Sequence, residues 1–225
     1  MNINGVPQKL TLATRITLVR LLSIPVFILL VVYYASETRE GERNEYLRCV
    51  ATVLFVAAAL TDALDGYLAR VRHERTKLGA MLDPIADKAL LLAGLVLLSI
   101  QWHDSRGELI LQPHIPIWYA LTVISRDVFL ILGSVLIHFT VGHVEVKARY
   151  SGKASTLLQM VIIVWVLIGG PAHRSYFWLL MAATACTLIS AAQYLKDGIR
   201  QIERAHAHPP PGAPPSAPRP AEPLP

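Results

Sequence analysis

Four aspartates lie between apolar stretches of the sequence, and they form two pairs. Asp62 and Asp65 are three residues apart, and Asp83 and Asp87 are four residues apart. On helices, both spacings place the two side chains of a pair on one face. An ionisable side chain inside a membrane-spanning helix costs about 3 kcal/mol or more unless it is paired, hydrated or bound to an ion. The two pairs therefore predict a functional site.

Carboxylates brought close together repel one another, so a cation must neutralise them or their pKa values must rise. Hard carboxylate oxygens suit Mg²⁺, Mn²⁺ or Ca²⁺ and disfavour zinc. Two divalent ions, Mg²⁺ or Mn²⁺, would balance four aspartates. Two metal ions bound side by side can hold phosphoryl oxygens and activate an attacking hydroxyl. The pattern thus predicts phosphoryl-group transfer.

Small residues accompany the acids, at Gly66, Ala69 and Gly79. A glycine inside a helix costs about 1 kcal/mol relative to alanine, so these positions indicate a ligand close to the backbone. Ordinary small-residue packing between membrane helices is the alternative explanation.

Together these positions resemble the signature of the CDP-alcohol phosphatidyltransferase family. The matching residues are Asp62, Asp65, Gly66, Ala69, Arg70, Gly79, Asp83 and Asp87. The resemblance implies a six-helix membrane enzyme, commonly a homodimer, that transfers a phosphatidyl or similar group from a CDP-linked donor to an alcohol and releases CMP.

The resemblance also implies a role for each residue. Asp62, Asp65 and Asp83 would bind the metal ions, and Asp87 would complete the metal site and act as the catalytic base for the acceptor hydroxyl. Arg70 would contact the donor phosphates. The expected CDP-donor site consists of Asp62, Gly66, Ala69, Arg70 and Gly79.

Two segments bear on the acceptor. The N-terminal "ATRITLVRLLSIP" resembles the start of phosphatidylglycerophosphate synthases and CMP-forming cardiolipin synthases, but it has Ala-Thr where they have Pro-Asn. "SGKASTLLQM" resembles glycerophosphate enzymes, whereas Ser125-Arg126-Asp127 resembles cardiolipin synthases. We favour CDP-diacylglycerol as donor and glycerol 3-phosphate as acceptor, with phosphatidylglycerol as the alternative acceptor.

Three basic residues are candidates for binding the acceptor phosphate: Arg126, Arg149 and Lys153. Arginine offers a bidentate fork to phosphate, and lysine a point charge. Arg126 could instead pair with a carboxylate inside the protein. Arg149 and Lys153 could simply mark the cytoplasmic side of the membrane.

The elements that must position these residues are membrane helices. The chain of 225 residues is 53% hydrophobic and 16% charged, with a mean hydropathy of +0.44. A span needs about 20 mainly apolar residues. The predicted spans are residues 16–35, 46–69, 80–101, 116–140, 154–170 and 175–195. We therefore predict an all-α polytopic membrane protein with six transmembrane helices.

The predicted organisation has three parts. Residues 1–14 form an interfacial N-terminal segment, residues 15–204 the six-helix transmembrane domain, and residues 205–225 a disordered Pro-rich tail. Lysine and arginine gather before the first span, in the second and fourth connectors and after the last span. This alternation predicts a multi-pass protein of the bacterial plasma membrane with both termini in the cytoplasm.

Other functional classes fit the sequence less well. Basic residues sit in short connectors rather than in one stripe, so no nucleic acid partner is expected. A transporter would spread its acids over several spans and depths, whereas these cluster on two consecutive helices. Aromatic prenyltransferases also use two aspartate-rich motifs, but they need more spans and carry another aspartate where this chain has Ala69.

Overall fold

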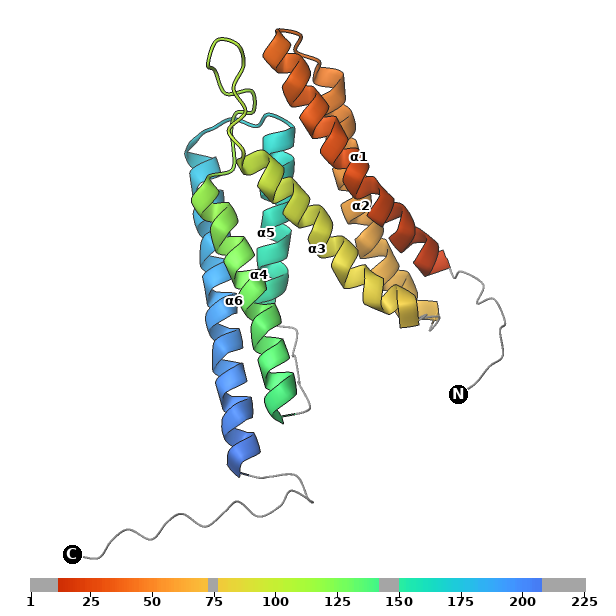
Figure 1. Cartoon of the computed structure of the whole chain (residues 1–225), viewed down its shortest axis with the longest axis vertical. Helices are drawn as coiled ribbons and strands as arrows, with labels where there is room; N and C mark the ends of the chain where they lie inside the picture. Colours follow the sequence, from red (N-terminus) through yellow and green to blue (C-terminus); the bar gives the residue numbers. More distant parts are fainter. Residues whose placement is uncertain (1–11, 73–76, 142–149, 208–225) are drawn as a thin grey trace, which may run out of the picture.

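The computed structural model describes the backbone of residues 12–72, 77–141 and 150–207, and the side chains of residues 18–61, 88–136 and 150–200. Within these ranges the chain forms six α-helices and no strand (Figure 1). Their bounds are α1 Leu12–Glu40, α2 Glu45–Arg72, α3 Lys77–Ser99, α4 Ile117–Val141, α5 Tyr150–Leu167 and α6 Arg174–Ala207. Each predicted span overlaps one of these helices, which confirms the all-α fold class for the part of the chain that the structure describes.

Glycines end two of the helices by the same hydrogen-bonding pattern. After α1, Gly41 has φ 101°, and the Glu42 N–H donates to the Glu37 carbonyl at 3.0 Å. After α5, Gly169 has φ 67°, and the Gly170 N–H donates to the Trp165 carbonyl at 2.9 Å. A left-handed residue followed by a bond that spans five positions is the Schellman motif, which satisfies the last carbonyls of a helix.

The helices form two groups that meet along α3. In the first group α1 packs against α2 and α3, and in the second α6 packs against α4 and α5. α3 runs obliquely between the groups and contacts α4 and α5, while α2 also contacts α5 (Figure 1). Buried side chains such as Phe27, Phe55, Leu98 and Ile163 form one apolar core across both groups.

Four described segments are long and apolar enough to cross a membrane, judged by length and composition. They are Leu18–Glu40, Ile117–Leu136, Tyr150–Leu167 and Arg174–Arg200. Lys88–Ser99 of α3 is a shorter apolar stretch. Large apolar side chains on α4, including Phe129 and Leu132, point outward, as is required next to lipid. The protein is therefore a membrane protein, and the full count of six spans stays a prediction.

The ends of the predicted domain fall inside helices. α1 begins at Leu12, within the predicted interfacial segment, and α6 continues to Ala207, within the predicted tail. Residues 1–11 and 208–225, which make up the rest of those two segments, lie outside the described residues.

Candidate active site

The eight residues of the aspartate motif lie on two consecutive helices. Asp62 to Arg70 belong to the C-terminal part of α2, and Gly79 to Asp87 to the N-terminal part of α3. Only residues 73–76 separate the two helices, so their facing ends lie within about 18 Å of each other along an extended chain. Figure 1 shows these ends at the same end of the bundle, where α1 also begins.

The side chains of the eight motif residues lie outside the described ones, so their individual roles remain predictions. Among the side chains that are described, no group of three or more His, Cys, Asp or Glu residues could hold a metal ion. What the backbone does provide is two helices with the predicted i, i+3 and i, i+4 spacings.

The residue after Asp87 connects the motif helix to α4. The Lys88 Nζ donates to Asp127 Oδ2 at 2.7 Å, and the Arg126 Nη1 donates to Asp127 Oδ1 at 2.7 Å. Each oxygen of one carboxylate therefore holds a different cation. The Arg126 Nη2 in turn donates to Ser190 Oγ on α6 at 2.8 Å. We call these four residues, Lys88, Arg126, Asp127 and Ser190, the Asp127 cluster.

Burial within the Asp127 cluster is uneven. The side chains of Arg126 and Asp127 are 8% and 12% exposed, whereas that of Lys88 is 43% exposed. The Arg126 Nε is buried and has no hydrogen-bond partner in the described part of the chain. Because a buried unsatisfied donor costs about 1–3 kcal/mol, this N–H is suited to an anion oxygen or a water molecule. From the sequence, Arg126 could either bind phosphate or pair with a carboxylate inside the protein. The structure contains such a pair with Asp127, and the Nε–H of Arg126 still lacks a partner among the described residues.

Polar residues of α5 and α6 extend the cluster. A Cβ on Gly152 would lie 3.4 Å from Arg126 Nη2, so α5 passes directly beside the guanidinium. Ser155 and Thr187 share a hydrogen bond of 2.7 Å, and the Gln159 Nε2 donates to Ser155 Oγ at 3.1 Å.

Gln159 also borders a small hollow between α3, α4 and α5. Lys88 and Asp127 line the same hollow, whose volume of about 10 Å³ leaves room for one water molecule at most. Gly152 and Gln159, which belong to the segment that resembles glycerophosphate enzymes, thus lie around Arg126 and Asp127.

The three residues predicted to bind the acceptor phosphate are not brought together by the described part of the structure. Arg126 lies in the Asp127 cluster, where it shares the Asp127 carboxylate with Lys88, the residue that follows Asp87. Lys153 is exposed near the start of α5, and Arg149 lies outside the described residues. Arg20, the second arginine of the N-terminal segment "ATRITLVRLLSIP", is buried on α1 and only 3% exposed.

The sequence patterns predicted no role for Lys88 or Ser190. Lys88 carried a signal, because it is a lysine that directly follows the last motif aspartate and begins the apolar stretch Lys88–Ser99 of α3. Ser190 carried none, because it is one of several small polar residues in α6.

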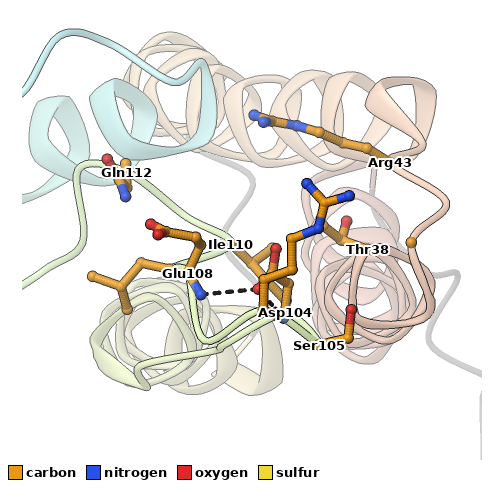
Figure 2. A pocket seen from close by; sticks show the side chains of 10 residues that line it. Thr38, Arg43, Asp104, Ser105, Glu108, Ile110 and Gln112 are labelled. Carbon is orange, nitrogen blue, oxygen red and sulfur yellow. Dashed lines mark hydrogen bonds between the residues drawn. The ribbon is translucent and has the colours of Figure 1, made fainter.

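A much larger hollow, of about 550 Å³, lies at the opposite end of the bundle between the end of α1 and the connector from α3 to α4. It is lined by Thr38, Gly41, Arg43, Asp104, Ser105, Arg106, Glu108, Leu109, Ile110 and Gln112. Figure 2 shows the Asp104 carboxylate hydrogen-bonded to the backbone of Glu108 within the same loop. None of the predicted site residues lines this hollow, so size alone does not mark the candidate site.

Comparison with known proteins agrees with the motif. Residues 10–189 match the CDP-alcohol phosphatidyltransferase family. The chain is 32% identical over 203 residues to the "Probable phosphatidylglycerophosphate synthase" of Mycobacterium tuberculosis (strain ATCC 25618 / H37Rv), covering 89% of this chain and 87% of that protein.

A second relative has a comparable extent of similarity. The "CDP-diacylglycerol--glycerol-3-phosphate 3-phosphatidyltransferase" of Escherichia coli (strain K12) is 28% identical over 204 residues, covering 89% of this chain and 97% of that protein. Because the family match and these alignments run through nearly all of the helical region, the chain belongs to the CDP-alcohol phosphatidyltransferase family and is an enzyme of that family.

Proposed function

We propose that this enzyme transfers the phosphatidyl group of CDP-diacylglycerol to glycerol 3-phosphate and releases CMP. The two relatives described above carry names for this activity. The observation that supports it best is the ion pair from Lys88 to Asp127, because it brings the buried Arg126 guanidinium beside the helix that carries Asp83 and Asp87. A phosphate-bearing acceptor requires such a group close to the reacting centre.

The four motif aspartates are suited to hold two divalent ions, Mg²⁺ or Mn²⁺. Both pairs lie on helices whose ends face each other, and carboxylate oxygens are the donors these ions prefer. When bound, the ions would neutralise the donor pyrophosphate and make the acceptor hydroxyl easier to deprotonate. Asp62, Asp65, Asp83 and Asp87 would be the ligands.

The chain's own residues would then perform the transfer. Asp87 takes the proton of the acceptor hydroxyl, whose oxygen forms a bond to the phosphatidyl phosphorus. The bond from that phosphorus to the bridging pyrophosphate oxygen breaks, and CMP leaves. Arg70 binds the donor phosphates, while Gly66, Ala69 and Gly79 let the cytidine approach the helices. Because the leaving group is already activated, catalysis consists chiefly of charge neutralisation and alignment.

Arg126 would bind the acceptor phosphate, with Arg149 and Lys153 adding positive charge nearby. The Arg126 Nε–H, which has no hydrogen-bond partner in the described part of the chain, and the remaining N–H groups of Nη1 and Nη2 offer donors to phosphate oxygens. Arginine recognises phosphate by paired hydrogen bonds. Phosphatidylglycerol is the competing acceptor, which the same donors could meet through its phosphodiester.

The enzyme would act in a bacterial plasma membrane as a homodimer, with six spans and both termini in the cytoplasm. α1 begins and α6 ends at the same end of the bundle as the aspartate motif (Figure 1). This arrangement suits a site open to the cytoplasm, because the CDP group is soluble while the acyl chains stay in lipid. Residues 1–14 would lie at the interface and residues 205–225 would form a disordered tail.

The proposal is tested by measuring CMP release from CDP-diacylglycerol by the purified protein in detergent. Glycerol 3-phosphate and phosphatidylglycerol are supplied separately, each with Mg²⁺, with Mn²⁺ or with excess EDTA. We expect metal-dependent release that requires glycerol 3-phosphate. Release with phosphatidylglycerol alone would identify a cardiolipin synthase instead, and release unaffected by EDTA would refute the metal site.

A further inference from the structure

We infer that Asp127 is a positioning residue for the acceptor site, which fixes the Arg126 guanidinium relative to the motif helix. This inference rests on the proposed function for the identity of the acceptor phosphate. Asp127 itself is not expected to touch the substrate, because both of its carboxylate oxygens already accept hydrogen bonds from Lys88 and Arg126.

The geometry of the contact with Arg126 is unusual for a helix. Adjacent residues of a helix do not face each other, yet the Arg126 Nη1 lies 2.7 Å from Asp127 Oδ1. Ser190 holds the second terminal nitrogen, Nη2, from a different helix at 2.8 Å. Two contacts on different nitrogens fix both the position and the plane of the guanidinium before any ligand arrives, which lowers the entropic cost of binding.

The charge balance of the Asp127 cluster also fits an anion. Lys88 and Arg126 contribute two positive charges and Asp127 one negative charge, so the cluster carries one net positive charge. A carboxylate near a phosphate is repulsive unless cations bind it, and here each oxygen has its own cation. Asp127 can therefore orient Arg126 without cancelling the attraction of the cluster for phosphate.

The hydrogen bond from Lys88 to Asp127 also fixes the position of α4 relative to α3. It follows Asp87 directly on α3, whereas Arg126 and Asp127 belong to α4. Because the Asp127 carboxylate accepts from Lys88 and from Arg126, a shift of α4 relative to α3 would break the charged hydrogen bond between Lys88 and Asp127. The distance between the bound acceptor phosphate and the motif is thereby held nearly constant, as near-attack alignment requires.

The test separates positioning from ordinary helix packing by steady-state kinetics of Asp127→Asn. The amide cannot serve both cations with full charge, so we expect the KM for glycerol 3-phosphate to rise about 10-fold or more, as for loss of a charged hydrogen bond. The KM for CDP-diacylglycerol should change less than about 2-fold, within ordinary context effects. Asp127→Glu, which keeps the charge, should recover part of the loss.

Ser134→Ala is the matched control. It removes a hydrogen bond of 3.3 Å between Ser134 and Tyr194. This bond joins α4 to α6, as the bond from Arg126 to Ser190 does, but lies away from the cluster. We expect both KM values to stay at the wild-type level in this variant. A rise in the KM for glycerol 3-phosphate here equal to that of Asp127→Asn would show that α4–α6 packing is responsible, and would overturn the inference.

The remaining outcomes also discriminate. Wild-type protein that releases no CMP with glycerol 3-phosphate refutes the proposed function itself. Active wild type together with an Asp127→Asn variant that loses only kcat, or raises both KM values equally, refutes the positioning role alone. If Asp127→Asn does not purify as a monodisperse protein, Lys88→Met decides: the KM for glycerol 3-phosphate must rise, and Lys88→Arg must restore it.

Discussion

The end of the helical bundle far from the aspartate motif and the middle of the bundle both carry charged side chains, but the charges are satisfied in different ways. At the far end, Asp104 Oδ1 accepts from the backbone N–H of Arg106 and Glu108 at 2.8 and 2.9 Å, and Arg43 pairs with Glu45 two residues away. In the middle of the bundle, Lys88 pairs with Asp127, 39 residues away along the chain, and Arg126 donates to Ser190, 64 residues away.

The contacts at the far end lie within one short segment of the chain, whereas the Asp127 cluster holds separate helices together. Local contacts at the far end need only a short turn and remain largely in water. The Asp127 cluster joins α3, α4 and α6, and the side chains of Arg126 and Asp127 are about nine-tenths buried. A buried charge left without its partner is strongly destabilising. The smaller and more buried polar cluster is therefore the better candidate for function, although the far-end hollow is larger.

The largest effect should come from the motif itself. Asp87→Asn removes the proposed base and a metal ligand, so we expect CMP release to fall by about 10³-fold or more, in the range of losing general-base catalysis. Asp104→Asn at the far end provides the comparison and should retain wild-type turnover. Turnover of Asp87→Asn close to wild type would remove Asp87 from the mechanism.

Arg126→Met should have the next largest effect. Loss of a charged hydrogen-bond donor to the acceptor phosphate is worth about 1.5–3 kcal/mol, which corresponds to a KM for glycerol 3-phosphate about 10- to 100-fold higher. Arg106→Met, which removes an arginine from the far-end hollow, is the matched control. Equal kinetics in the two variants would contradict a special role for the Asp127 cluster.

Ser155→Ala should lower stability with little effect on activity. It removes the buried hydrogen bond to Thr187 on α6 and the one from Gln159. A net loss of about 1 kcal/mol lowers the Tm of a chain this size by about 2–4 °C. Thr184→Ala is the comparison, because within the described part of the chain the Thr184 hydroxyl donates only to the Leu180 carbonyl of its own helix. The melting temperature of this variant should hardly change.

The smallest effect concerns the far-end loop and pH. Backbone hydrogen bonds, that from the Glu108 N–H above all, lower the pKa of Asp104. A lowered folded-state pKa stabilises the loop fully above the unfolded value of about 3.9 and loses this effect as pH falls through the lowered value. The protection of the Arg106 and Glu108 amides, which is their exchange rate relative to that of an unstructured chain at the same pH, should therefore be lost only at strongly acidic pH. Loss of protection already near pH 6 would show that the carboxylate does not hold the loop.

The helices and the spacing of the aspartates could be predicted from the sequence, because they depend on residues that are close together in the chain. Long apolar stretches predicted six helical segments, and each of them overlaps one of the six helices that the described residues form. The spacing of the aspartates pointed to paired carboxylates on two helices, and the family resemblance is confirmed. Helix ends were predicted less well, since α1 and α6 run several residues past the expected boundaries.

The sequence by itself thus determined the helices, the location of the motif and the family. It left Arg126 undecided between a phosphate ligand and an internal ion pair, because that choice depends on which faces of α3, α4 and α6 meet. Only the tertiary structure brought Lys88, Asp127 and Ser190 to Arg126. Helix formation is governed by contacts a few residues apart, whereas the rotation of a helix about its axis is set by packing partners far along the chain.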